Sequence, residues 1–184
     1  MELPSVRQKL IDHKHHEWIH RTEYVAGLFE KHILKDSNII QLGCACGYVL
    51  DALWEMGYRN LTGLDKNPVW SDWNPEIKFI HSELEKVIDK LDSYDVVLCT
   101  QFLYTFPPNK EWLFEKIAKK VKKYLVVVEK EEENTSVHWG RNYKDIFEAF
   151  DLKQIFEEIK VFPLQFGNLT TTTTRIFKNG SNKV

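Results

Sequence analysis

The residues with the clearest chemical potential form a short loop of small side chains, Gly43 to Gly47, with the sequence GCACG. The loop follows an apolar run and precedes a segment with helical spacing, which predicts a strand, a turn and a helix. Small residues let a backbone approach a ligand closely. Asp65 follows about 20 positions later, the separation at which an acid reaches the ribose hydroxyls of a bound adenosine. The pair therefore predicts a ligand that contains adenosine.

The elements that must position this loop alternate along the chain. Predicted strands cover residues 38–42, 60–64, 77–80, 94–99, 124–128, 152–162 and 169–177, and predicted helices cover 48–56, 83–91, 110–122 and 142–150. This alternation predicts an α/β fold with a mostly parallel sheet and helices on both faces. The connection over residues 163–168 is too short for a crossover helix, so the last two strands are predicted to be an antiparallel pair at the sheet edge.

The chain is predicted to be a single domain, because 184 residues can bury a core without disulfides or a metal. Amphipathic spacing over residues 5–34 predicts helix before the first strand. We divide the domain into an N-terminal helical cap (1–36), a Rossmann-like core (37–178) and a tail (179–184) that we expect to be disordered.

Composition argues against several classes of protein. The formal net charge of −2 gives no broad electrostatic footprint for nucleic acid. No apolar run reaches the roughly 18 residues that span a bilayer, and the first residues lack the apolar core of a signal peptide. Cys44, Cys46 and Cys99 fit neither a disulfide framework nor a C-x-x-C site. We therefore expect a reduced cytoplasmic protein without membrane partners.

The glycine spacing separates two kinds of adenosine ligand. A dinucleotide fingerprint needs glycines at positions 43, 45 and 48, where this chain has Gly43, Ala45 and Tyr48. Bulk at the third position interferes with the close helix–strand packing of that motif. A G-x-G-x-G pattern needs positions 43, 45 and 47, and matches at Gly43 and Gly47. A nicotinamide-dependent oxidoreductase is therefore the disfavoured alternative.

Four segments resemble the motifs of class I S-adenosylmethionine-dependent methyltransferases: IIQLGCACG, LTGLDKNP, KFIHSELEKV and YDVVLCTQFLYTF. The resemblance covers residues 38–129. It implies a three-layer α/β/α sandwich with a seven-stranded sheet of order 3-2-1-4-5-7-6, the last strand antiparallel. It also implies S-adenosylmethionine as cofactor and methyl transfer to a small-molecule acceptor, in a protein that we expect to be a monomer or homodimer. A protein or tRNA methyltransferase and a degenerate, non-catalytic binding subunit are the alternatives.

The same resemblance implies a role for individual positions. Ser82 and Glu83 fall at the adenine-contacting turn, and Gln101 with Phe102 at the floor beneath the sulfonium. Arg21 resembles an arginine that contacts the ligand's carboxylate, to which a guanidinium fork is suited; a solvated arginine is the alternative. The expected cofactor site comprises Arg21, Gln41, Gly43, Cys44, Ala45, Gly47, Asp65, Lys66, Ser82, Glu83, Gln101 and Phe102.

Two positions depart from the family pattern. Gln41 stands where the family usually has an acid, although its amide oxygen can still accept a hydrogen bond. Ala45 replaces the middle glycine and adds a Cβ where backbone meets ligand. Both departures motivate the non-catalytic alternative, because a fold does not guarantee its usual function.

No catalytic residue or metal ligand is assigned from the sequence. A sulfonium activates its own methyl group, so transfer mainly requires alignment, and a base is needed only if the acceptor retains its proton. Tyr104 and His138 are candidates for such a base. His16 to His20 match the H-E-x-x-H signature of zinc proteases, but the segment is histidine-rich and lacks that structural context. We further expect Tyr143 beside the substrate cleft and the stretch 130–133 in solvent.

Overall fold

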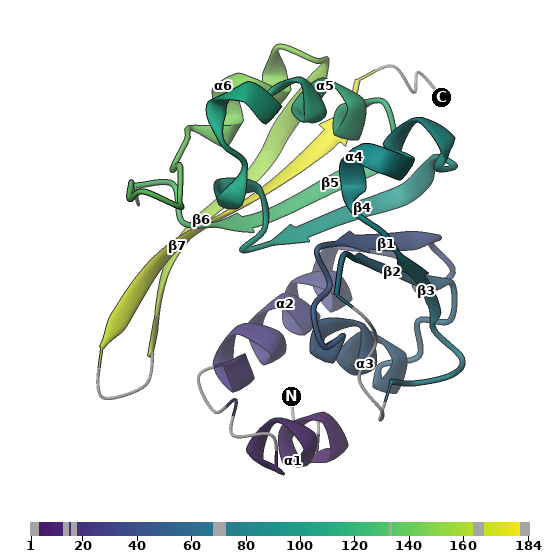
Figure 1. The fold of residues 1–184 in the computed structure, drawn as a ribbon. Coiled ribbons are helices and arrows are strands. Elements are labelled where there is room, and N and C mark those ends of the chain that lie inside the picture. Colours follow the sequence, from purple (N-terminus) through teal and green to yellow (C-terminus); the bar gives the residue numbers. More distant parts are fainter. Residues whose placement is uncertain are drawn as a thin grey trace.

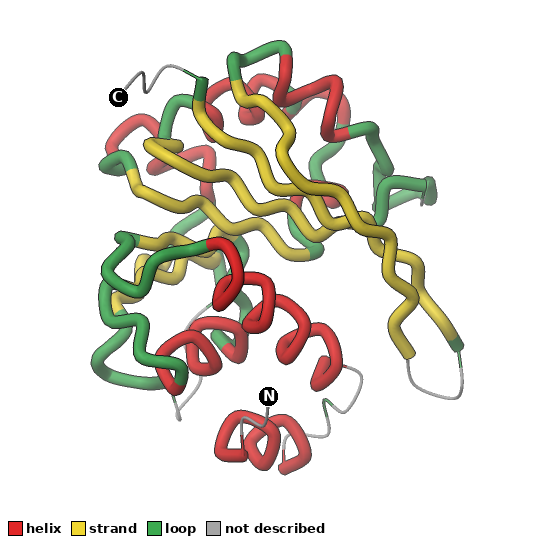
Figure 2. The backbone as a smooth tube through the Cα atoms, turned by 180° about the vertical axis from the view of Figure 1, so that it is seen from behind, coloured by secondary structure: helices red, strands yellow, loops and turns green. Residues whose placement is uncertain are grey.

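The computed structural model describes residues 4–12, 15, 18–67, 73–132, 134–163 and 168–180. Within these residues a seven-stranded sheet forms the centre of the molecule (Figures 1 and 2). Its strands are β1 (Ile39–Leu42), β2 (Leu61–Asp65), β3 (Lys78–His81), β4 (Tyr94–Thr100), β5 (Val121–Glu129), β6 (Leu152–Pro163) and β7 (Leu169–Asn179). Their order is β3-β2-β1-β4-β5-β7-β6, with β7 antiparallel to both of its neighbours. The predicted fold class and strand order are confirmed.

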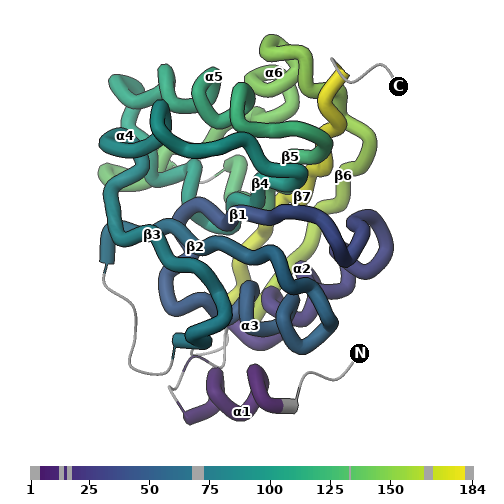
Figure 3. Tube along the Cα trace, turned by 90° about the vertical axis from the view of Figure 1, so that its right-hand side faces the viewer, coloured from purple at the N-terminus to yellow at the C-terminus, as the bar shows by residue number. Residues whose placement is uncertain are grey.

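Helices cover both faces of the sheet and give three layers (Figure 3). One face carries α1 (Pro4–Asp12), α2 (Ile19–His32) and α3 (Tyr48–Glu55), and the other carries α4 (Leu84–Val87), α5 (Trp112–Ala118) and α6 (Tyr143–Glu148). Every residue of β1 and β2 is buried. That is the burial expected of parallel strands covered on both sides, and it makes the ends of these strands a rigid base for the loops that follow.

The N-terminal segment forms two helices. α1 packs on α3 through Val6 and Leu10, and Lys9 forms an ion pair with Asp51 at 2.6 Å. α2 begins at Ile19 and lies against the sheet through Val25 and other buried residues. Both helices therefore lie on the same face of the core (Figure 1).

Three predicted boundaries were wrong. The helix predicted to reach residue 122 ends at Ala118, because Val121 already pairs with Tyr94 as the first residue of β5. The predicted helix 83–91 is the short α4 followed by a 3-10 turn over Ile88–Lys90. Asn179, placed in the tail, is the last residue of β7 and donates a side-chain hydrogen bond to the Val121 carbonyl at 2.7 Å. Residues 181–184 lie outside the described part.

β6 and β7 form a long hairpin that extends beyond the body of the molecule (Figures 1 and 2). The last pair between β5 and β7 is Glu129 with Thr173, so the first residues of β7 pair with β6 alone. The Tyr24 hydroxyl of α2 donates to Glu158 at 2.8 Å, which joins the hairpin to the helices. Over the ranges that the structure describes, no helix has the length and apolar character needed to cross a bilayer.

Candidate functional site

The carboxyl ends of β1, β2 and β4 lie side by side. Leu42 pairs with Leu64 on one side and with Cys99 on the other. The backbone N–H groups of Gly43 and Cys44 then donate to the Leu64 carbonyl, at 2.8 and 3.0 Å. The loop after β1 therefore folds back across the end of β2, at the edge of the sheet where α/β proteins of this type bind their ligands.

The glycine loop contains three residues with left-handed backbone. Gly43 and Gly47 have φ angles of 68° and 78°, and Ala45 has a φ of 47°. A Cβ on Gly43 would lie 2.2 Å from Cδ2 of Phe102, and one on Gly47 would lie 2.5 Å from Cζ3 of Trp73. Both positions thus require glycine for conformation and for space. Ala45 adopts the same conformation at a cost of about 1–2 kcal/mol.

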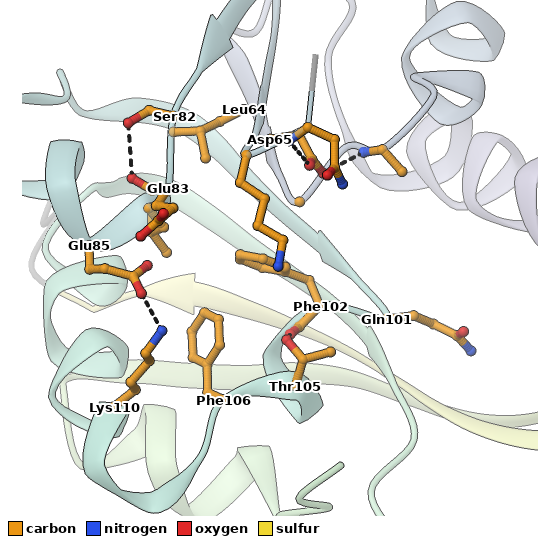
Figure 4. Close-up of a pocket in the computed structure, with 15 residues that line it drawn as sticks. Leu64, Asp65, Ser82, Glu83, Glu85, Gln101, Phe102, Thr105, Phe106 and Lys110 are labelled. Atoms are coloured by element: carbon orange, nitrogen blue, oxygen red, sulfur yellow. Dashed lines mark hydrogen bonds and ion pairs between the residues drawn. The ribbon is translucent and has the colours of Figure 1, made fainter. Parts of the chain in front are cut away.

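Asp65 ends β2 directly beneath this loop (Figure 4). Its Oδ2 accepts a hydrogen bond from the Ala45 N–H at 2.8 Å, and its Oδ1 accepts one from the Asn67 N–H at 2.9 Å. The residue is 8% exposed. Each carboxylate oxygen has a second lone pair, so Asp65 can hold the loop and still accept a hydrogen bond from a ligand.

Two cavities open on either side of this loop. The larger has a volume of about 560 Å³ and is lined by Asp65, by the turn after β3 with Ser82 and Glu83, and by Phe102 and Phe106 (Figure 4). The smaller, of about 190 Å³, is lined from the other side by Trp18, Arg21, Thr22, Gln41, Tyr48 and Tyr104. They share three residues, Gly43, Ala45 and Gln101. A single elongated ligand can therefore occupy both.

The structure places eleven of the twelve expected site residues in the lining of these cavities. Lys66, like Asp65, lines the larger cavity, and Cys44, like Gln41, lines the smaller. Gly47 lines neither and instead begins α3 against Trp73. The alternative that Arg21 is a solvated residue on the helix surface is excluded, because Arg21 is only 8% exposed. Its guanidinium lies 6.0 Å from the centre of the Phe162 ring.

Gln41 presents an unsatisfied acceptor to the smaller cavity. Its Nε2 donates to the Thr100 hydroxyl at 2.9 Å, which leaves Oε1 directed away from that bond. Oε1 is buried and has no hydrogen-bond partner among the described residues, and the same holds for Nε2 of Gln101. Buried polar atoms without partners are rare in native proteins. Both residues line the smaller cavity, and together they offer an acceptor and a donor that suit a ligand with both kinds of group.

Glu129, at the end of β5, is a site residue that the sequence motifs do not reveal. Its carboxylate is fully buried and accepts hydrogen bonds from the backbone N–H groups of Phe102 (2.8 Å), Leu103 (3.0 Å) and Tyr104 (3.4 Å). Burial raises the pKa of Glu129 to about 7, while these N–H groups and Arg21 oppose the rise. The sequence offered one signal for this residue, which is that a glutamate directly follows the apolar run over residues 124–128.

Other expected positions have different surroundings. Tyr104 lines the smaller cavity, and its ring centre lies 4.4 Å from that of His138. Tyr143 lines neither of the two cavities; it is fully buried and packs on Phe147. Glu131 is not a solvated residue, because it forms two 2.7 Å hydrogen bonds with the Arg175 guanidinium.

The cysteines and the histidine motif contribute no nucleophile or metal centre to the described site. Cys44 and Cys99 are buried, and burial raises the pKa of each thiol above its ordinary value, so both are protonated at neutral pH. His16 and Glu17 of the H-E-x-x-H match lie outside the described residues, and His20 is exposed on α2. Among the described residues, no group of three or more His, Cys, Asp or Glu side chains is arranged to hold a metal.

Comparison with known proteins identifies the family. Residues 10–160 match the family profile of a methyltransferase domain, so the chain belongs to this methyltransferase family. A comparison with curated protein sequences gives no significant match.

Solved structures share the fold at low sequence identity. The Synechocystis magnesium protoporphyrin IX methyltransferase with bound S-adenosylmethionine is 13% identical, with a TM-score of 0.67 over 97% of this chain and 86% of that chain. The 1,6-didemethyltoxoflavin-N1-methyltransferase of Burkholderia thailandensis, with bound 1,6-didemethyltoxoflavin and S-adenosylhomocysteine, is 10% identical, with a TM-score of 0.67 over 98% and 92%. A methyltransferase from Methanosarcina mazei is 14% identical, with a TM-score of 0.64 over 83% and 96%.

S-adenosylmethionine is the cofactor of this family, and the residues present fit it. The shared edge of the two cavities is lined by backbone without bulky side chains, and Asp65 keeps acceptor capacity there. The unpartnered Gln41 oxygen suits an ammonium group. At position 41, where the family pattern has an acid, the bond from Nε2 to Thr100 leaves the amide oxygen of Gln41 without a partner.

Proposed function

We propose that the protein transfers the methyl group of S-adenosylmethionine to a small-molecule acceptor. The observation that carries this proposal is the pair of cavities that meet at Gly43, Ala45 and Gln101. One cavity contains the acid suited to a ribose, and the other contains the amide oxygen suited to an ammonium group. Two cavities with these groups that share Gly43, Ala45 and Gln101 suit a ligand with adenosine at one end and an amino acid at the other.

Different residues are assigned to the two ends of the ligand. In the larger cavity Asp65 accepts hydrogen bonds from the ribose hydroxyls, Ser82 and Glu83 border the adenine, and Lys66 and Phe102 complete the walls. In the smaller cavity Gln41 Oε1 accepts a hydrogen bond from the ammonium group, and Arg21 faces the carboxylate. Gly43, Cys44 and Ala45 form the backbone between them, and Gly47 supports that backbone from α3.

The chain contributes positioning rather than a reactive group. When bound, the cofactor supplies an electrophilic methyl group on a sulfonium. The described residues then exclude water and hold the acceptor in line, and alignment of this kind can supply up to roughly 7–11 kcal/mol of the barrier. Tyr104 borders the smaller cavity, and an aromatic ring beside a sulfonium gains about 0.5–2 kcal/mol. No general base is assigned.

Two observations support a small molecule over tRNA or protein. Lys110, a cation at the larger cavity, forms an ion pair with Glu85, and the chain's net charge is −2. A phosphate backbone would instead require several available cations. Two structural relatives are named for small-molecule substrates.

The test is a calorimetric titration of the protein with S-adenosylmethionine, S-adenosylhomocysteine and NAD. We expect micromolar binding of both sulfur ligands, no binding of NAD, and at least tenfold weaker binding after Gln41→Leu, because a buried hydrogen bond to a charged group contributes about 1.5–3 kcal/mol. Gln8→Leu, an exposed change on α1, is the matched control. A folded protein that binds neither sulfur ligand would favour the non-catalytic subunit.

The acceptor class is tested by release of S-adenosylhomocysteine. The protein is incubated with S-adenosylmethionine and, separately, with a small-molecule fraction of a cell extract, with bulk tRNA and with a protein fraction. Turnover with the small-molecule fraction alone is the expected result. Turnover with tRNA or protein alone would replace the small-molecule assignment and keep the methyltransferase activity.

A further inference from the structure

We propose that Glu129 is a positioning residue for methyl transfer: its carboxylate fixes residues 101–104, a segment that contributes to the lining of both cavities. The inference rests on the proposed function. It assigns a specific task to a residue outside the cofactor motifs, because Glu129 reaches the site through backbone contacts and lines neither cavity.

Three consecutive N–H groups converge on this one side chain. Those of Phe102 and Leu103 donate to Oε1 at 2.8 and 3.0 Å, and that of Tyr104 donates to Oε2 at 3.4 Å. Leu103 and Tyr104 are themselves buried at the start of a 3-10 turn, Leu103–Thr105. The first N–H groups of such a turn have no partner within it. Glu129 therefore supplies acceptors that this segment does not provide for itself.

The segment is held in a strained conformation between two neighbouring anchors. Gln101 has a left-handed φ of 49°, and its N–H donates to the Val128 carbonyl at 2.9 Å. Glu129 holds the next three residues. A non-glycine residue remains in this conformation only when its surroundings enforce it. The end of β5 therefore enforces the reversal of the chain after β4.

Both cavities depend on where this segment lies. The Gln101 side chain extends away from Phe102 and Phe106 (Figure 4), and Gln101 lines both cavities. Phe102 lines the larger cavity, and its ring occupies the space where a Cβ of Gly43 would lie. A shift of the backbone at residues 101–104 would thus change the contact with the glycine loop and the lining of both cavities at once.

The charge state of Glu129 decides how well its carboxylate can accept the hydrogen bonds of residues 102–104. Arg21 of α2, Cys99 of β4 and Tyr143 of α6 interact with it electrostatically, and Thr173 of β7 lies opposite it in the sheet. Burial keeps the pKa values of Cys99 and Tyr143 well above their ordinary range, so both are neutral. Burial also brings the pKa of Glu129 to about 7. A protonated carboxyl would place a donor where three donors already converge.

The experiment follows two readouts from pH 5.5 to 8.5 in the wild-type protein, in Glu129→Gln and in the control Glu132→Gln, an exposed residue on the loop after β5. The first is the amide NMR shifts of residues 102–104, which need no cofactor. The second is the affinity for S-adenosylhomocysteine. We expect the wild-type amides to shift with a midpoint near 7 and the affinity to fall about tenfold from pH 8 to pH 6, following the ionised fraction.

Glu129→Gln is expected to remove the amide titration and to bind at least about tenfold more weakly than the wild type at pH 8, with little further loss at pH 6. Glu132→Gln is expected to behave as the wild type. Any pH-dependent change in these amide shifts that persists in Glu129→Gln comes from another group and is thereby separated. The titration of the wild type can be interpreted even if a variant does not fold.

The outcomes separate the two proposals. If the wild type binds S-adenosylhomocysteine and Glu129→Gln binds equally well at every pH, the positioning role is overturned and the proposed function stands. If the wild type does not bind it, the proposed function fails, and the amide shifts still decide whether Glu129 anchors the segment. Shifts of residues 102–104 that are the same in Glu129→Gln as in the wild type at every pH would overturn the inference directly.

Discussion

The Oδ2 atom of Asp65 accepts a hydrogen bond from the backbone N–H of Ala45, at 2.8 Å. This bond joins the end of β2 to the middle of the loop after β1, so the acid and the loop form one structural unit. The acid therefore has two tasks, because the same carboxylate orders the loop and faces the larger cavity.

We predict that Asp65→Asn weakens binding of S-adenosylhomocysteine by about 10- to 100-fold. The amide retains one oxygen but places an NH₂ group against a backbone N–H, and a lost hydrogen bond to a charged group costs about 1.5–3 kcal/mol. Calorimetry measures the affinity, and Asp92→Asn, at an exposed position, is the control. An unchanged affinity in Asp65→Asn would mean that the ribose is bound elsewhere.

Ala45→Gly is predicted to raise the free energy of unfolding by up to about 1 kcal/mol, with affinity for the cofactor kept or improved. Ala45 has a φ of 47°, which glycine adopts without the penalty of a Cβ. Chemical denaturation measures the difference. Ala149→Gly, at an exposed residue with a φ of −65°, is the opposite control and should lower stability by up to about 1 kcal/mol. Equal losses in both variants would show that Ala45 is unstrained.

The strands and the cofactor motifs could be predicted because they depend on local patterns, whereas the strand order followed only from the resemblance to the methyltransferase family. Apolar runs that end in Gly43 and Asp65 mark the ends of two parallel strands, and those ends must meet at one edge of the sheet. The predicted end of the helix over 110–122 was wrong. The lysine-rich residues before Tyr124 suit an exposed helix face as well as the exposed first residues of β5. Register with Tyr94 decides between the two, and register is not visible in a local window.

Contacts between residues far apart in the chain could not be predicted from the sequence. Glu131 reads as part of an acidic, solvated run, yet it meets Arg175, which lies 44 positions away. Glu129 reads as the end of a strand, although it carries three backbone bonds. In both cases the partner is brought near by the sheet order, so the function of the side chain follows from topology and not from its neighbours in the chain.

The ion pair of Arg175 and Glu131 leads to a stability prediction. Their side chains are 8% and 10% exposed, and removing one partner of a buried pair typically costs about 3–5 kcal/mol. Arg175→Gln is therefore predicted to lower the free energy of unfolding by about 3 kcal/mol. Arg7→Gln, whose pair with Glu23 has a side chain 51% exposed, should cost less than about 1 kcal/mol. Urea denaturation that gives similar values for both would contradict this.

Glu129 also makes stability depend on pH. Its pKa is about 7 in the folded protein against an ordinary 4.5, so between these values the folded state retains a proton that the unfolded state has released. The free energy of unfolding therefore falls as pH rises through this window, by about 3 kcal/mol from this group. The difference in the free energy of unfolding between the wild type and Glu129→Gln should change by that amount between pH 4.5 and pH 8. Parallel curves would show that the carboxyl is ionised throughout.

β7 lies between β5 and β6 in the sheet but follows both of them in the chain. During synthesis β6 therefore leaves the ribosome before the strand that joins it to the rest of the sheet. In that interval both of its edges are open, and an unpaired strand edge is a template for pairing with another chain. The arrival of β7 joins β6 to the sheet and closes one of these edges, so the interval before it leaves the nascent chain open to aggregation.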